Sequence, residues 1–429
     1  MDDASRSNDA QDDAQDAAQY VAQYVAPDDA WLDAECRRLL DFGRRVVHPR
    51  GGAAWLDDDG APDLGRPVHT WITSRTVHVH GIGALLGVDG AASTAAGALD
   101  GLRGVLRDPE HGGWFGAVGP DGERDDAKSC YAHAFVMLAG STAVVAGLPG
   151  ADDVLAEATQ VFEEHFWDDD LGRVVDEWDR AWTTPVPYRG LNSTMHSLEA
   201  MLAVGDVTGD DVWHRRAARL AGLVLELAPS YDGRLPEHFG PDWSVDLELN
   251  RDRPDDPFKP YGATVGHGLE WSRLLLHLEA TLGDAAPAGL LDTSRLLFDR
   301  AVADGWHADG APGFVYTTDW QGRPVVRQRM HWVVAEGISA AAALHRRTGE
   351  EGYARRYAEW WAYARDHLID LERGSWRHEL DAANRPQASV WPGKPDLYHA
   401  VQATLVPRLP LAPSLARAVA MSGGLRAPA

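Results

Sequence analysis

The feature that most constrains the fold of this chain is a succession of helix-forming stretches that begins near Trp31 and continues almost to the C-terminus. Apolar residues recur three or four positions apart over stretches of about 15–20 residues, and turns rich in Gly, Pro and Asp separate them, as expected for amphipathic helices. About twelve stretches follow this pattern, over residues 29–48, 72–88, 91–106, 126–147, 150–167, 192–208, 210–228, 264–283, 285–304, 328–348, 350–370 and 397–422.

The two members of most consecutive pairs differ in polarity. The first is rich in Ala and Gly and is apolar nearly all round, as in VVAEGISAAAAL, whereas the second carries more charge, as in HRRAARLAGLVLEL. A helix that is apolar on every side is buried, and a helix with a charged face is exposed on that face. About six buried helices inside about six exposed ones predict an all-α protein with an (α/α)6 barrel.

Short segments between the pairs have strand and turn character. Pro120-Asp121-Gly122 and Gln321-Gly322 are typical of tight hairpin turns. We expect short β-hairpin loops at one end of the barrel, where they would form the rim of a pocket. The segments concerned are residues 112–123, 172–178 and 313–325.

One longer stretch, residues 235–264, has too many Pro, Asp and aromatic residues for a helix. A loop of this length is usually functional. Because it leads directly into His267, we expect it to lie over the mouth of the pocket.

Residues 1–28 have a different composition from the rest of the chain. They are rich in Asp, Ala and Gln and contain little apolar surface, so they predict a disordered acidic tail. The remainder, residues 29–429, is then a single catalytic barrel domain.

Charge and composition exclude several classes of protein. The net charge of −25 argues against a nucleic acid or an anionic membrane as a partner, because both require basic patches. The chain has 2 Cys, no basic and apolar leader, and no apolar run of about 18 residues. These features predict a protein without a disulfide framework or a membrane span, located in the cytoplasm.

Four segments place a polar or charged residue three or four positions from a His, Arg, Glu or Trp at the expected start of an apolar helix. This spacing puts both side chains on one face of a helix. Together the segments predict a pocket lined by histidines from several helices, suited to acid–base chemistry. They are WITSR at 71–75, NSTMH at 192–196, VGHGLEW at 265–271 and KPDLYHA at 394–400.

Motifs for cofactors and metals are missing from the sequence. No HxH spacing, CxxC spacing or HxxxH motif with an accompanying carboxylate stands out as a metal site, and neither GxGxxG nor GxxxxGK[ST] occurs. We therefore expect no metal, no dinucleotide and no nucleoside triphosphate.

Several longer strings resemble the N-acylglucosamine 2-epimerase superfamily. They are LNSTMHSLEAMLAVGDVTGD, DWSVDLELNRDRPDDPFKPYGATVGHGLEWSRLLL, GSWRHELDAANRP and WPGKPDLYHAVQATLVPRLPL, and the resemblance extends in order from about residue 30 to 415. It implies an (α/α)6 barrel that is a monomer or a homodimer and acts on a monosaccharide.

The implied activity is that of the isomerase branch, which interconverts mannose and fructose, and also lyxose and xylulose, through a cis-enediol. Within the same superfamily, 2-epimerisation of N-acylglucosamine or cellobiose and isomerisation of sulfoquinovose stay open. Of other classes, a glycoside hydrolase would need a pair of carboxylates across the bond that is cleaved. A non-catalytic sugar-binding protein would need aromatic platforms but no acid–base pair.

The resemblance also implies roles for particular residues. His399 matches the histidine that carries the proton between C2 and C1, and His267 matches its partner in ring opening and in proton transfer at oxygen. Arg75, Asn192 and His196 match substrate-binding positions.

Chemistry adds further candidates to these. Glu270, one helical turn beyond His267, is expected to orient the His267 ring. Trp71 and Trp391 are expected to stack on the sugar, and Glu336 either reaches the pocket or stabilises the core near Trp332. Five other histidines, His78, His80, His133, His331 and His378, either line the pocket or are ordinary core residues.

Overall fold

The structure is a computed structural model that describes residues 24–423. Most of the predicted tail, residues 1–28, therefore lies outside the described residues. The first described helix begins where the sequence predicts it, at Asp29. The carboxylate of Asp28 accepts a hydrogen bond from the backbone nitrogen of Trp31 at 2.8 Å, which is a typical N-terminal cap.

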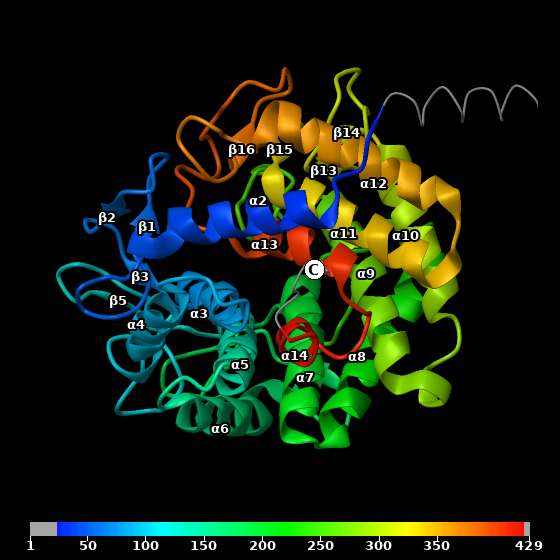
Figure 1. The fold of residues 1–429 in the computed structure, drawn as a ribbon. Helices are drawn as coiled ribbons and strands as arrows, with labels where there is room; N and C mark the ends of the chain where they lie inside the picture. The colour runs from blue at the N-terminus through cyan, green and yellow to red at the C-terminus, as the bar shows by residue number, and fades with distance from the viewer. Residues whose placement is uncertain (1–23, 424–429) are drawn as a thin grey trace, which may run out of the picture.

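Within the described residues, six helices form a closed inner ring in which each helix contacts the next and the last contacts the first (Figure 1). These helices are buried on nearly every side, because their sequences are apolar all round. The inner helices are α3 (Thr70–Leu85), α5 (Cys130–Val145), α7 (Leu191–Thr208), α9 (Val265–Leu282), α11 (His331–Thr348) and α13 (Tyr398–Leu405).

A second set of helices surrounds this ring, and each packs on one inner helix. The first helix of the chain, α2, packs on the last inner helix, α13, so the two ends of the chain close the barrel. The predicted (α/α)6 barrel is confirmed. The outer helices are α2 (Asp29–Phe42), α4 (Ala91–Arg103), α6 (Ala151–Val161), α8 (Asp211–Ser230), α10 (Leu290–Gly305) and α12 (Glu351–Tyr363).

The last predicted helical stretch, residues 397–422, is two helices in the structure. Helix α13 ends at Leu405, and α14 (Leu415–Met421) packs against α3, α5 and α7 near the middle of the ring (Figure 1). Three prolines in the connecting VPRLPLAP segment interrupt the helix, because proline lacks a backbone N–H and its ring clashes with the preceding turn. No helix among residues 24–423 has the length and apolar character needed to cross a membrane.

Short antiparallel strands lie at the N-terminal ends of the inner helices. Five inner helices directly follow a strand, and that strand pairs with one that comes after the next outer helix. The predicted turns at Gly122 and Gly322 connect β4 to β5 and β13 to β14, and both glycines have positive φ.

The strands lie at residues 55–56 (β1), 62–63 (β2), 68–69 (β3), 117–118 (β4), 124–125 (β5), 128–129 (β6), 167–168 (β7), 173–174 (β8), 177–178 (β9), 189–190 (β10), 238–239 (β11), 263–264 (β12), 317–318 (β13), 324–326 (β14), 329–330 (β15) and 379–380 (β16).

Candidate active site

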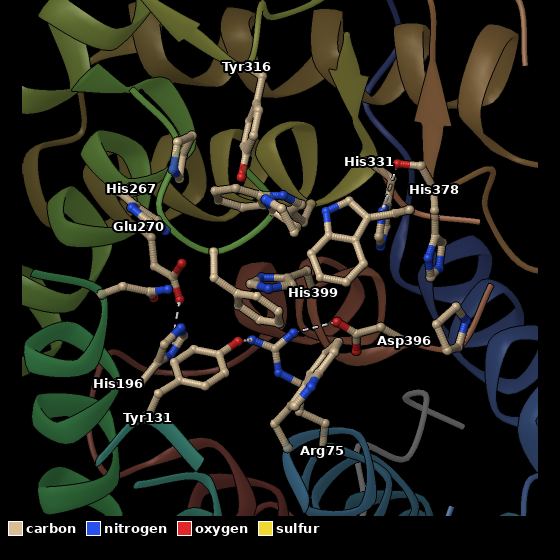
Figure 2. A pocket seen from close by; sticks show the side chains of 18 residues that line it. Arg75, Tyr131, His196, His267, Glu270, Tyr316, His331, His378, Asp396 and His399 are labelled. Carbon is tan, nitrogen blue, oxygen red and sulfur yellow. Dashed lines mark hydrogen bonds and ion pairs between the residues drawn. The ribbon is translucent and has the colours of Figure 1, made fainter. Parts of the chain in front are cut away.

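A cavity of about 710 Å³ lies at the end of the barrel where the inner helices begin (Figure 2). Every predicted site residue except Glu336 lines it. The lining consists of Trp71, Arg75, Tyr131, Asn192, His196, Pro257, Phe258, Pro260, His267, Glu270, Tyr316, His331, Trp332, His378, Trp391, Pro395, Asp396 and His399.

The second residue of an inner helix recurs in this lining. Because each inner helix starts at the same end of the barrel, its first turn faces the axis at the same depth. Side chains one turn further on, four positions later, lie on the same helical face. The second-position residues are Trp71, Tyr131, Asn192, Trp332 and His399, and Arg75, His196 and Glu270 lie four positions after a second residue.

Helix α9 departs from this pattern at Gly266, its second residue. A Cβ atom at this position would lie 2.3 Å from the ring of Trp332. Glycine therefore leaves room for that ring against α9, and the next residue, His267, supplies the side chain that lines the cavity.

His399 is oriented by a buried carboxylate from the neighbouring inner helix. Its Nδ1 atom lies 2.8 Å from Oε1 of Glu336, whose other oxygen accepts a hydrogen bond from Nε of Arg273 at 3.0 Å. Burial alone would raise the pKa of Glu336, but Arg273 and His399 outweigh it and hold the pKa below its usual value. Glu336 is thus an ionised partner behind His399 rather than a residue of the cavity wall.

His267 is also oriented by a carboxylate, but by a different one from that expected. Its Nδ1 atom lies 3.0 Å from Oε2 of Glu237, a buried residue just before β11. The expected contact between His267 and Glu270 is not formed. Glu270 instead lies near Arg273, at 3.6 Å, and near Nδ1 of His196, at 4.0 Å. His267 and Glu270 are one helical turn apart on α9, which suggested the contact. Glu237 comes from outside that helix, and no sequence motif pointed to it.

These contacts fix which nitrogen of each ring is available to a substrate. A carboxylate can only accept a hydrogen bond, so Nδ1 of His267 and of His399 is the donor, and Nε2 has the free lone pair. Both rings are therefore held in the form in which Nε2 can accept a proton.

Glu270 and Glu336 carry opposite pKa shifts. Burial raises the pKa of Glu270 well above its usual value, and the charge of Glu336 raises it further. Of the two carboxyl groups, Glu270 is the one that retains a proton. The pKa of His196 is lowered to about 4, chiefly by burial, so its ring is neutral near pH 7.

Arg75 is the cation of the cavity wall, and it is already paired. It forms a buried ion pair with Asp396, and its Nη2 atom donates to the hydroxyl of Tyr131 at 3.1 Å (Figure 2). Burial would raise the pKa of Asp396, but Arg75 holds it far below its usual value, so the carboxylate is ionised. The pair presents fixed hydrogen-bonding groups with little net charge.

Aromatic rings surround the mouth of the cavity. The ring centroids of Trp71 and Trp391 are 5.9 Å apart, and Phe258 lies 5.5 Å from Trp391 and 6.1 Å from Trp71. Phe258 belongs to the long segment 235–264, so that loop lies at the cavity as expected. Flat apolar rings of this kind suit the face of a pyranose.

The five additional histidines fall into two groups. His331 and His378 line the cavity. His78 lines a second cavity at the other end of the barrel, His80 lies in a small internal gap, and His133 bonds to backbone atoms of Ser129 and Trp114. These three are therefore core residues.

No metal-ligand spacing stands out in the sequence, but within residues 24–423 the fold brings together two groups of possible donors. They are His196, Glu199 and Glu270, and Glu270, Glu336 and His399. Arg273 already contacts two of these carboxylates, and His399 donates to one. A guanidinium therefore provides the positive charge that a metal ion would supply there.

A helical barrel whose axial cavity holds oriented histidines, buried carboxylates and aromatic walls is suited to acid–base chemistry on a small polar molecule. The chain belongs to the N-acylglucosamine 2-epimerase family, whose model matches residues 51–403.

Among curated relatives, it is 53% identical over 397 residues to a D-mannose isomerase of Thermobifida fusca, covering 92% of this chain and 97% of the relative. It is 46% identical over 394 residues to a D-mannose isomerase of Pseudomonas cannabina pv. alisalensis, covering 91% and 95%. A crystal structure of a D-mannose isomerase superposes with a TM-score of 0.82 at 27% identity, covering 88% of this chain and 97% of that one.

Proposed function

We propose that this chain is an aldose–ketose isomerase that interconverts mannose and fructose. The observation that carries the proposal is the pair of histidines, His267 and His399, which line one cavity and each rest on a buried carboxylate. The names of the two relatives with full-length similarity support mannose as the aldose.

The mechanism begins with the sugar bound between the aromatic rings and opened with help from His267, which moves the proton between the ring oxygen and the C1 hydroxyl. Nε2 of His399 then removes the proton from C2. The electron pair of the C–H bond becomes the C1–C2 double bond, and the electron pair of the C1 carbonyl moves onto its oxygen, which gives the enediolate form of the cis-enediol. Arg75 and the protonated Glu270 are positioned to donate hydrogen bonds to oxygens on which negative charge develops.

The second half of the reaction returns the proton to a different carbon. His399 gives its proton to C1, and Nε2 of His267 takes the proton of the C2 hydroxyl, which becomes a carbonyl, and passes it to the C1 oxygen. This yields the ketose. Because C1 and C2 of a cis-enediol are adjacent carbons of one planar double bond, a single imidazole on one face of it can serve both carbons.

The cavity is less suited to glycoside hydrolysis than to isomerisation. That reaction uses two carboxyl groups facing the scissile bond. The acidic residues of the lining are Glu270 and Asp396, and Asp396 is bound to Arg75. The site thus offers two oriented imidazoles, but not two carboxyl groups that could face a scissile bond.

We also propose that the protein acts as a monomer or a homodimer in which each chain has its own site, because His267, His399, Glu270 and Arg75 already meet in one cavity of a single chain. The buried thiols of Cys36 and Cys130, with Cα atoms on separate helices and no disulfide between them, suit the expected cytoplasmic location.

The test is incubation of the purified protein with mannose, fructose, glucose, lyxose and cellobiose, followed by chromatography of the products. We expect fructose as the main product from mannose, mannose from fructose, and slower conversion of lyxose. Glucose as the main product from mannose would assign the chain to the epimerases, and no conversion of any of the sugars would contradict the proposal.

A further inference from the structure

His331 and His378 form a second pair of histidines in the cavity that the mechanism above does not use. They come from separate elements, since His331 is the first residue of α11 and His378 directly precedes β16. The pairing of β15 with β16 brings them together, and the backbone nitrogen of His331 donates to the carbonyl of His378 at 3.1 Å. The backbone therefore fixes their relative position.

The two imidazole rings are stacked face to face. Their centroids are 4.0 Å apart and their planes differ by 9°. Nδ1 of His331 lies 3.3 Å from the carbonyl oxygen of His378, which can only accept, so this nitrogen is the donor and Nε2 of His331 is an acceptor. The Nε2 atoms of both rings are buried and have no hydrogen-bond partner within the described residues.

Burial lowers the pKa of both histidines, that of His378 to about 4 and that of His331 well below its usual value. Both rings are therefore neutral near pH 7. Two stacked neutral imidazoles do not repel each other as two imidazolium ions would, and each retains one ring nitrogen for a ligand.

The pair lies on the other side of His399 from His267 (Figure 2). The proposed reaction needs C1 and C2 of the sugar between His267 and His399. The part of a bound hexose that extends past His399 is then the part remote from the reacting carbons, which is carbons 4 to 6.

The geometry points to His331 and His378 as the residues that recognise the remote hydroxyl groups of the sugar, on carbon 4 or carbon 6. This inference rests on the proposed function. Nε2 of His331 would accept a hydrogen bond from a sugar hydroxyl, and Nε2 of His378 would bond to the same or the neighbouring one. The unpartnered buried nitrogens are satisfied when a hydroxyl is present and are left without a partner when it is missing.

The same geometry selects against a charged group at this end of the substrate. A phosphate dianion or a sulfonate monoanion has no proton to give to the acceptor nitrogen of His331. The cation of the wall, Arg75, is already bound to Asp396. The substrate class is therefore an uncharged hexose with a free hydroxyl on carbon 4 or carbon 6.

The test compares kcat/KM for mannose, 4-deoxymannose and 6-deoxymannose in the wild-type protein and in His331→Phe and His378→Phe. Phenylalanine keeps a flat ring in the stack and removes the nitrogens. The ratio of two kcat/KM values does not depend on the fraction of active protein, so partial misfolding does not affect it. His78→Phe is the matched control, because His78 is also buried with an unpartnered Nε2 but lines the cavity at the other end of the barrel.

We expect wild-type protein to prefer mannose over at least one deoxy sugar by about tenfold or more, since a site built around a hydroxyl rejects an analogue that lacks it. The ratio of kcat/KM for mannose to kcat/KM for that deoxy sugar should fall at least fivefold in one of the two phenylalanine variants. His378→Gln restores a hydrogen-bonding group and should recover part of the lost preference for mannose. The control His78→Phe should leave the ratio unchanged.

Ratios that stay within twofold of wild type in both phenylalanine variants would overturn the inference. If those variants fail to fold, the wild-type ratios decide: values near one for both deoxy sugars would overturn it as well. Wild-type turnover of mannose is measured in the same assay, so failure of the proposed function shows as the absence of fructose and is separate from failure of the inference.

Discussion

The two histidine–glutamate pairs of the cavity have similar bond lengths but different surroundings. Glu336 and His399 lie on the adjacent inner helices α11 and α13, and Arg273 of α9 binds the second oxygen of Glu336. Glu237 lies outside the inner ring, just before β11, and its second oxygen has no partner within the described residues. One pair is thus built into the rigid ring, and the other joins the ring to the loop layer.

This difference matches the demands of the two proton transfers. Removing a proton from carbon requires an exact distance and angle, because the transition state has little tolerance for misplacement. Transfer between oxygens is easier and tolerates more movement. We infer that the helix-to-helix pair serves the carbon and that the helix-to-loop pair serves the oxygens.

The largest effect is expected on replacing His399 itself. His399→Ala should fold normally and lose about 10²–10⁴-fold in kcat, the contribution typical of a general base. Steady-state kinetics on mannose, with circular dichroism to verify folding, measures it. Retention of more than a tenth of the wild-type kcat would remove His399 from the proton-transfer role.

A smaller effect should separate the two supporting carboxylates. Glu336→Gln should lower kcat by about ten- to a hundredfold, by analogy with the loss found when the hydrogen-bond partner behind a metal-bound histidine is removed. It also leaves the buried Arg273 with one fewer carboxylate partner. Glu237→Gln is the matched variant, and we expect a smaller loss because no cation depends on it. An equal or greater loss in Glu237→Gln would reverse the assignment of the two pairs.

Glu270→Gln should lower kcat less than Glu336→Gln does, because glutamine resembles the protonated acid. In the folded protein the pKa of Glu270 is raised above its usual value of 4.5, by burial and then by Glu336. Its contribution to stability is therefore full below pH 4.5 and is lost as pH rises toward the folded pKa. Glutamine does not ionise, so the variant does not lose this stability as the pH rises. The Tm of the variant minus the Tm of the wild type should therefore increase between pH 5 and pH 8. A difference in Tm that is constant over this range would show that Glu270 is ionised in the fold.

The smallest expected effect concerns metal ions. Glu270, Glu336 and His399 form a possible donor group, but Arg273 and the proton on Nδ1 of His399 already occupy the carboxylates. Exhaustive treatment with EDTA should leave kcat unchanged. Loss of activity that Mn²⁺, Co²⁺ or Zn²⁺ restores would mean that the ring-embedded pair binds a metal rather than acting as a base.

Sequence periodicity was sufficient for the barrel, because an inner helix must be apolar all round and an outer helix only on one face. It failed at residues 397–422, where prolines divide the last helix. The cavity residues lie in the first turns of the inner helices. The motifs around His196 and His399 mark such helix starts, so they placed both residues in the cavity correctly. The same reasoning applied to the second residue of every apolar helix would also have indicated Tyr131 and Trp332.

Partners that come from other segments could not be predicted in this way. Glu237 and His267 are 30 positions apart, and Glu336 and His399 are 63 apart, so no local spacing links them. Their contacts arise from the closure of the ring and from strand pairing. Helical spacing predicted Glu270 as the partner of His267. Two residues close together on one helix need not contact each other, and the His267 ring contacts a carboxylate from another segment instead.

The central claim is that one histidine moves a proton between C2 and C1 of a cis-enediol, and isomerisation of mannose in D₂O tests it most directly. The proton on the imidazolium partly exchanges with solvent before it returns to carbon, so we expect deuterium at C1 of fructose in part of the product, and at C2 of mannose when the reaction is run from fructose. NMR spectroscopy measures both positions. Fructose and mannose formed without deuterium at either carbon would indicate a direct hydride shift and would contradict the account.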